Sequence, residues 1–115
     1  MNMSIEVRFR GRSGKAWAFQ RVDMDAPWAR AAGAAIFAAP DTYGWRVIRV
    51  VELSGRPHDV QPLWALADAE KYGANAVFLS VEFDAATRKR MVNDIEEGFS
   101  PVCLGGMDHS APIAA

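Results

Sequence analysis

The sequence predicts an α+β domain, in which helices pack on a small, mainly antiparallel sheet that is preceded by an N-terminal β-hairpin. Segments that alternate apolar and polar residues come first along the chain, as expected of half-buried strands. Patterns typical of helices appear only later, at 60–72 and 85–97. Because strands and helices are largely segregated along the chain, the order favours an α+β arrangement over a doubly wound parallel sheet.

The N-terminal hairpin is expected within residues 1–22. Apolar residues alternate with charged ones in SIEVRFR at 4–10, and a second alternating segment follows at 16–22. The intervening GRSGK at 11–15 contains two glycines that can adopt a positive φ. We therefore expect two antiparallel strands joined by a short loop.

Two further strands are expected at 33–39 and 45–52, joined by the turn residues DTYG. The segment that precedes them, 23–32, contains Pro27, which suits a first helical turn, so a turn or a one-turn helix is expected there. The strand at 45–52 is rich in β-branched residues and mostly apolar on both faces. This pattern predicts a central strand.

The C-terminal half is expected to form a helix, a strand and a second helix. Helix formers fill 60–72, with a bend expected at Pro62. Apolar residues alternate again at 75–83, and Asp84 is a suitable N-cap for the helix at 85–97. The order of elements is therefore β-β-β-β-α-β-α.

These elements are expected to form one domain over 1–104, with its core at 33–104 and a flexible tail at 105–115. The length of 115 residues leaves no room for a second independent core. Half of the residues are hydrophobic and 23% are charged, which excludes a largely disordered chain. The net charge of -1 argues against a dedicated high-affinity nucleic-acid binder.

The cysteine content and the absence of a targeting pattern favour a cytoplasmic protein. Cys103 is the only cysteine, so an intramolecular disulfide is excluded. We find no apolar run long enough to span a bilayer and no signal peptide. The frequent use of alanine, arginine and tryptophan is typical of a GC-rich bacterial genome.

The highest density of positive charge lies near the N-terminus, at Arg8, Arg10, Arg12 and Lys15. A phosphate backbone could bind such a stripe. Alternatively, the charges belong to an edge strand, where they prevent edge-to-edge aggregation. The near-neutral total charge favours the second interpretation.

Glu52, His58 and Asp59 could form an acid/base or metal cluster. Capping of the helix that follows explains Asp59 equally well, and the structural interpretation is favoured. Cys103 has no evident activating partner, and His109 lies in the expected tail.

The tryptophans could serve as stacking platforms for bases or as core residues. They are spread over every part of the chain and do not share one surface, which favours core or half-core roles. The four are Trp17, Trp28, Trp45 and Trp64.

Residues 14–104 resemble the GIY-YIG nuclease superfamily, whose members are small α/β domains that cut DNA. The resemblance begins with SGKAWAFQRV and GAAIFAA and continues through GWRVIRVVEL and KYGANAVFL. It ends with ATRKRMVNDIEEGFSPVC, which is similar to the family's last helix and its Pro-x-Cys close. The resemblance implies a nuclease scaffold over about four-fifths of the chain.

On the two motif strands, the resemblance implies one tyrosine each and a glycine. Ala35 and Arg49 stand at the two tyrosine positions, and Val51 stands at the glycine position. Alanine has no hydroxyl group with which to position or deprotonate a water molecule. The strand part of the family's chemistry is therefore missing.

On the helices, the resemblance implies an arginine, often a histidine, and a glutamate that binds metal. Asp59 and Leu63 take the first two positions, Val92 takes that of the glutamate, and Leu104 replaces a common asparagine. Valine cannot hold Mg²⁺, which requires oxygen ligands. The resemblance thus implies a scaffold that has lost its nuclease chemistry, with no catalytic residue, metal or cofactor.

The function expected from these observations is that of a catalytically inactive GIY-YIG-like domain that binds proteins or assembles with them. The partner is expected to be a second copy or an unknown protein, with no membrane involved. The alternatives are a metal-dependent nuclease with a relocated site around Glu52, His58 and Asp59, and a weak nucleic-acid binder that uses the arginine stripe.

One surface of the scaffold is expected to be unusually apolar for an open groove, and to be filled by neighbours or covered by a second copy about a two-fold axis. Arg49, buried on this face, is expected to pair with Asp59. The face is expected to carry Ala35, Val47, Val51, Leu63 and Val92.

Overall fold

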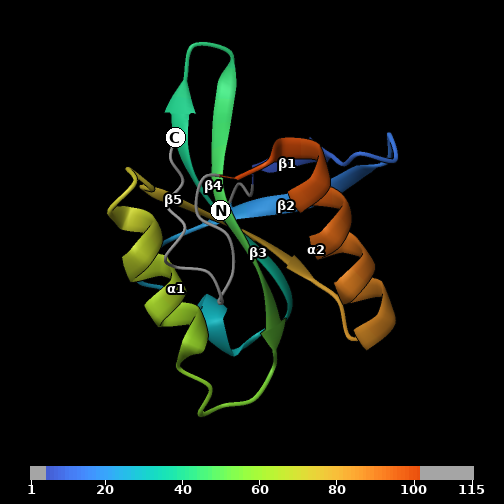
Figure 1. The fold of residues 1–115 in the computed structure, drawn as a ribbon. Coiled ribbons are helices and arrows are strands. Elements are labelled where there is room, and N and C mark those ends of the chain that lie inside the picture. Colours follow the sequence, from blue (N-terminus) through green and yellow to red (C-terminus); the bar gives the residue numbers. More distant parts are fainter. Residues whose placement is uncertain (1–4, 102–115) are drawn as a thin grey trace.

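The computed structural model describes residues 5–101 of the chain, which form an α+β domain (Figure 1). The expected order of strands and helices is confirmed, and the one-turn helix expected within 23–32 is the 3-10 helix η1, which begins at Pro27. The elements are β1 (Glu6–Arg10), β2 (Ala16–Val22), η1 (Pro27–Arg30), β3 (Ala32–Asp41), β4 (Gly44–Ser54), α1 (Gln61–Glu70), β5 (Ala76–Val81) and α2 (Ala85–Phe99).

The five strands form a single antiparallel sheet in the order β1-β2-β5-β3-β4. β1 and β2 are the N-terminal hairpin that the sequence predicts, and β3 and β4 form a second hairpin. β5 enters between the two hairpins and pairs with both of them. The edges of the sheet are therefore β1 and β4.

The two helices cover opposite faces of the sheet. In Figure 1, α1 lies on one side of β4 and α2 on the other. α1 and η1 cover a core cluster that includes Trp28, Phe37 and Leu66. α2 covers a second cluster around Phe9 and Phe78, and it contacts both edge strands, so the sheet curls around it. Neither of these helices is long and apolar enough to cross a membrane.

β4 is an edge strand, so the prediction of a central strand at 45–52 is wrong. Its two apolar faces have another cause, because α1 packs on one face and α2 on the other. A bulge at Ile48 also breaks the simple alternation, since Arg49 pairs with Phe37 while Val47 pairs with Ala38. An edge strand that is covered by a helix on each face therefore has the same apolar pattern as a central strand.

The helix starts follow the local chemistry of the preceding aspartates. Asp84 accepts a hydrogen bond of 2.9 Å from the backbone N–H of Thr87, as expected of an N-cap. Hydrogen bonds from the Thr87 side chain and backbone hold the pKa of Asp84 below its ordinary value. α1 begins at Gln61, so Pro62 lies in its first turn, and the bend expected there is wrong.

The N-terminal hairpin is fastened to α2 through Asp94. The carboxylate of Asp94 accepts hydrogen bonds from Trp17 Nε1 at 2.9 Å and from Ser13 Oγ at 2.7 Å. Its backbone carbonyl accepts the N–H of Arg12 at 3.0 Å. A Cβ added to Gly98 would lie 2.8 Å from the Arg12 nitrogen, so this close approach of loop and helix requires glycine.

Candidate functional site

The residues at the positions where the GIY-YIG resemblance implies catalytic side chains are only partly brought together in the structure. Arg49, Val51 and Val92 line one groove at the open edge of β4. Ala35 is fully buried inside the sheet, and Leu63 lies on α1 with half of its surface exposed. These positions therefore do not form one catalytic cleft.

The single apolar face expected from these positions does not exist. Val47 and Val92 belong to the core under α2, whereas Ala35 and Val51 belong to the core under α1. Because the helices cover opposite faces of the sheet, no single surface can contain all of these residues. The prediction is wrong for this reason.

The groove, which we call the β4 groove, has a volume of about 290 Å³. Its floor is the segment 49–52 of β4, and its walls come from the two helices that flank this strand (Figure 1). The residues of the walls are Gln61, Pro62 and Ala65 of α1 and Val92 and Glu96 of α2. It is thus mainly apolar, with a few charged groups.

Arg49 is the buried cation of the β4 groove, with 8% of its surface exposed. Its Nη1 lies 3.7 Å from Oδ2 of Asp68 on α1. The predicted partner, Asp59, is wrong, because its carboxylate accepts hydrogen bonds from Ser54 Oγ and from the Gln61 N–H instead. Asp59 lies before α1, where it serves the start of the helix, as the structural interpretation of this residue proposed.

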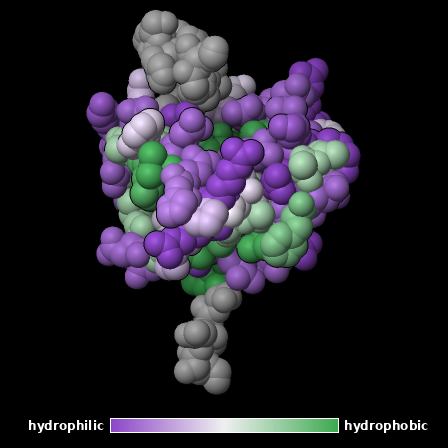
Figure 2. Space-filling model, turned by 90° about the horizontal axis from the view of Figure 1, so that it is seen from below, coloured by the Kyte–Doolittle hydropathy of each residue, from purple (hydrophilic) through white to green (hydrophobic). Residues whose placement is uncertain are grey.

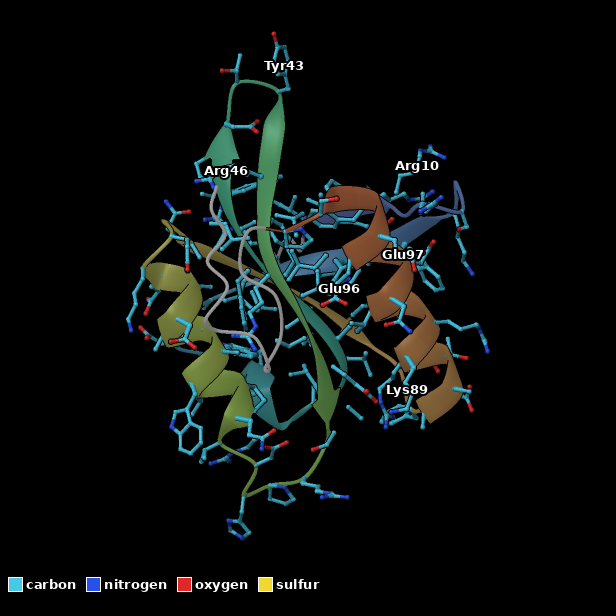
Figure 3. All side chains as sticks on the ribbon, in the orientation of Figure 1. Arg10, Tyr43, Arg46, Lys89, Glu96 and Glu97 are labelled. Carbon is cyan, nitrogen blue, oxygen red and sulfur yellow. The ribbon has the colours of Figure 1, made fainter. Side chains whose placement is uncertain are left out.

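Glu96 supplies a half-buried carboxyl group to the opposite wall. Figure 3 shows it on the side of α2 that faces β4. Burial raises the pKa of Glu96 above its ordinary value, and the positive charge of Arg49 opposes this rise. The groove therefore offers a carboxyl group that gains from an additional hydrogen-bond donor.

Glu52 is held by α2 and does not join His58 and Asp59. Its carboxylate lies 3.1 Å from Arg88 Nε and 3.4 Å from Lys89 Nζ. His58 is exposed in the loop before α1. Within residues 5–101, no three His, Cys, Asp or Glu side chains lie close enough to hold a metal ion. The relocated metal site at Glu52, His58 and Asp59 is therefore wrong.

The backbone of β4 presents hydrogen-bonding groups to the β4 groove. The carbonyl of Ala32 accepts the N–H of Glu82, so even-numbered residues at the start of β3 direct their backbone groups toward β5. Odd-numbered residues then bond to β4, which makes Ala35–Val51 a hydrogen-bonded pair. By alternation, Val50 and Glu52 direct their N–H and C=O groups away from the sheet. Among the described residues, no strand pairs with this edge.

The basic stripe lies at the other edge of the sheet, as the edge-strand interpretation predicts. Arg8 forms an ion pair with Glu6 at 3.0 Å, and Arg10 donates a hydrogen bond to the carbonyl of Gly14. Lys15 Nζ lies 4.2 Å from the centre of the Trp17 ring. Part of the positive charge is thus engaged locally, and nucleic-acid binding by Arg8, Arg10, Arg12 and Lys15 stays a prediction.

Three of the tryptophans lie in or against the core, as predicted. Trp28 is buried, Trp45 packs edge-on against Phe78 at 5.0 Å, and Trp17 is half-buried. Trp64 differs, because 66% of its surface is exposed on the outside of α1. The exposure of this side chain departs from the core or half-core role that the sequence predicts. The sequence signal for this exposure is a second set of apolar residues at helical spacing on α1, separate from the set that faces the sheet.

Comparisons with known proteins identify no relative of this chain. No family model matches the chain, and searches of curated proteins and of solved structures found no match. The GIY-YIG resemblance therefore stays a prediction. Its residue Leu104, together with Cys103, His109 and the expected tail at 105–115, lies outside the described residues.

Proposed function

We propose that this chain is a protein-binding module without nuclease activity, and that it binds an extended segment of a partner along the open edge of β4. The observation that carries the proposal is the edge itself. β4 is eleven residues long, and the two helices that flank it leave its outer backbone groups facing the β4 groove. An extended peptide can add to such an edge as a further strand.

The side chains of the β4 groove suit this kind of ligand. Main-chain hydrogen bonds to Val50 and Glu52 would supply affinity that depends little on sequence. The apolar walls at Pro62, Ala65 and Val92 would take alternate side chains of the added strand. Glu96 would accept a hydrogen bond from a donor on the same strand.

The proposal that catalysis is absent rests on the residue types. Neither Ala35 nor Val92 can activate water or bind a metal ion. We expect that the purified protein does not cleave single- or double-stranded DNA with Mg²⁺ or Mn²⁺. Cleavage activity that copurifies with the chain and is lost on Arg49→Ala would contradict this part of the proposal.

The binding proposal is tested by selecting peptides from a random library on the wild-type protein and measuring their affinity for two variants. Glu52→Pro removes an outward N–H but no hydrogen bond to β3. Glu52→Ala is the matched control, because it loses the same ion pairs to Arg88 and Lys89 and keeps the N–H.

We expect the selected peptides to bind wild type and Glu52→Ala with similar affinity, and Glu52→Pro at least tenfold more weakly. Circular dichroism establishes that both variants are folded. Equal binding to both variants, or no peptide enriched on the wild type, would contradict strand addition at β4.

A further inference from the structure

The two ends of the β4 groove differ in charge. At one end, the carboxylate of Glu52 lies 3.1 Å from Arg88 Nε and 3.4 Å from Lys89 Nζ. Two cations of α2 therefore meet one anion of β4, and the excess charge at this end is positive. This end of the groove does not favour a cationic side chain of a ligand.

The other end of the groove has the opposite excess. Arg49 is its cation, and the Asp68 carboxylate of α1 lies 3.7 Å from Arg49 Nη1. Glu96 of α2 adds a second carboxyl group, on which the positive charge of Arg49 also acts. Among residues 5–101, Glu96 forms no ion pair of its own. One cation thus stands against two carboxyl groups, and a cation of a ligand would balance them.

α2 runs along the groove in the direction opposite to β4. Its first turns lie by Glu52 and its later turns by Arg49 (Figure 1). Val92 stands between these two positions, one helical turn before Glu96. A strand that adds to β4 therefore meets Val92 and Glu96 one after the other.

The spacing of Val92 and Glu96 matches that of alternate residues on a strand. Four residues of a helix rise about 6 Å, and residues i and i+2 of a strand are about 6.8 Å apart. Two such residues of the ligand point to the same side, toward α2, and the residue between them points toward α1. On α1 it meets Pro62 and Ala65, which are uncharged.

We propose that the β4 groove selects extended segments that carry a lysine or an arginine two positions away from an apolar residue. The basic residue binds Glu96, and the apolar residue packs on Val92. This inference rests on the proposed addition of a strand to β4 and deepens it, since it names the chemistry of the partner. Main-chain hydrogen bonds hold the strand at the edge, and Glu96 fixes its register.

Half-burial makes a cation the favoured partner of Glu96. Burial raises the pKa of this carboxyl group, because its charged form is partly removed from water. A hydrogen bond from an ammonium or guanidinium group compensates for this loss more fully than one from a neutral donor. The long stem of a lysine or an arginine can also lie on apolar walls while its charged end reaches the carboxylate.

Apolar contact alone does not define the ligand. Figure 2, a view from below, shows hydrophobic residues as small patches within a mainly hydrophilic surface. The walls of the groove likewise offer few apolar side chains, namely those of Pro62, Ala65 and Val92. Charge is therefore expected to contribute to the choice of ligand beside apolar contact.

Peptides selected from a random library on the wild-type protein test the inference. Their sequences are expected to share a lysine or an arginine at one position and an apolar residue two positions away. The consensus peptide, which we call the basic peptide, is then compared with a copy in which glutamine replaces the basic residue. Isothermal titration calorimetry measures the affinity of both peptides for the wild type, Glu96→Gln and Glu97→Gln.

Glu97→Gln is the matched control. It removes the same charge from the next residue of α2, but Glu97 lines a separate pocket with Ser13 and Lys15 of the N-terminal hairpin (Figure 3). A general effect of the charge of α2 is thus the same in both variants. Circular dichroism establishes that both variants are folded.

The wild type and Glu97→Gln are expected to bind the basic peptide at least about fivefold more tightly than its glutamine copy. This preference is expected to disappear in Glu96→Gln. Selected peptides that share no basic residue would overturn the inference. A preference that persists in Glu96→Gln, or that is lost equally in Glu97→Gln, would overturn it as well.

Glu52→Pro separates this inference from the proposed function. If the peptides bind Glu52→Pro much more weakly than Glu52→Ala but do not depend on Glu96, strand addition at β4 stands and the choice of a basic residue is wrong. If they bind both Glu52 variants equally, strand addition itself is wrong, and the inference that rests on it is overturned with it.

Discussion

The two edges of the sheet expose their backbones in different surroundings. On β1, the carbonyl of Ile5 accepts the Arg21 N–H, so by alternation the outward backbone groups belong to Glu6, Arg8 and Arg10. All three carry charged, exposed side chains, which discourage the pairing of a further strand. On β4 the outward groups lie in a groove with apolar walls. The difference indicates that β1 is protected against pairing and that β4 is open to it.

α2 contacts both edge strands, so truncating a buried side chain of this helix is expected to have the largest effect on stability. Ile95 is fully buried and belongs to the cluster that joins β1 and β4. Ile95→Ala is expected to lower the free energy of unfolding by about 2–5 kcal/mol, through lost burial and the cavity left behind. Chemical denaturation measures this value. A loss below about 1 kcal/mol would show that α2 does not hold the edges together.

The protected edge depends on Asp94, which fastens the β1–β2 hairpin to α2. Asp94→Asn is expected to speed the amide exchange of β1 and to leave that of β4 unchanged. Hydrogen bonds from the Trp17 and Ser13 side chains and the Ser13 backbone hold the pKa of Asp94 below its ordinary value of 3.8. Its contribution to stability is therefore complete above that value and is lost as the pH falls through the lower, folded-state pKa.

Amide exchange monitored by NMR at mildly acidic pH, with Glu97→Gln on the same helix as the control, measures this effect. Faster exchange at β4 than at β1 in Asp94→Asn would contradict the assignment of Asp94 to the hairpin.

At the open edge, the pKa of Glu96 is shifted in the direction opposite to that of Asp94. Its raised pKa means that the folded protein binds the proton more tightly than the unfolded chain does. Stability therefore falls as the pH rises from the ordinary value of 4.5 through the raised pKa. Glu96→Gln removes this decrease and is expected to stabilise the protein at neutral pH by less than about 1 kcal/mol.

Thermal unfolding of both proteins across the acidic to neutral range tests the effect of Glu96. If Glu96→Gln were less stable than the wild type at neutral pH, the attraction of Arg49 would exceed the cost of burial, and the account of the groove would be wrong.

The smallest effect is expected for the charges on β1. The double variant Arg8→Thr and Arg10→Thr removes protection from this edge, so slow aggregation at high concentration should increase, as light scattering measures. The same variant tests the nucleic-acid prediction. If Arg8 and Arg10 bind phosphates, the variant has a lower affinity for DNA and a shallower dependence on salt. Equal DNA binding by both proteins would exclude this role.

Most of the fold could be predicted from the sequence because its signals are local. The alternation at 16–22 gave the bounds of β2, and Asp84 gave the start of α2. The position of β4 in the sheet could not be predicted in this way. Its apolar faces report burial, and burial by two helices produces the same pattern as burial in the middle of a sheet.

The candidate site could be predicted only in part, for a similar reason. Arg49, Val51 and Val92 were singled out from the family resemblance and do line the β4 groove, but their partners come from other elements. The pairing of Arg49 with Asp68 depends on how α1 lies across β4, which no spacing in the sequence records. The apolar spacing of Leu63 and Trp64 is visible in the sequence, but the exposure of these side chains depends on which face α1 turns inward.

The exchange of individual backbone amides tests the difference between the edges most directly. NMR would follow Val50 and Glu52 on β4 and Arg8 on β1, before and after addition of a peptide selected on the wild-type protein. The account predicts that exchange slows at Val50 and Glu52, because their outward N–H groups gain partners, and that Arg8 is unchanged. Slower exchange at Arg8 with no change at Val50 and Glu52 would contradict it.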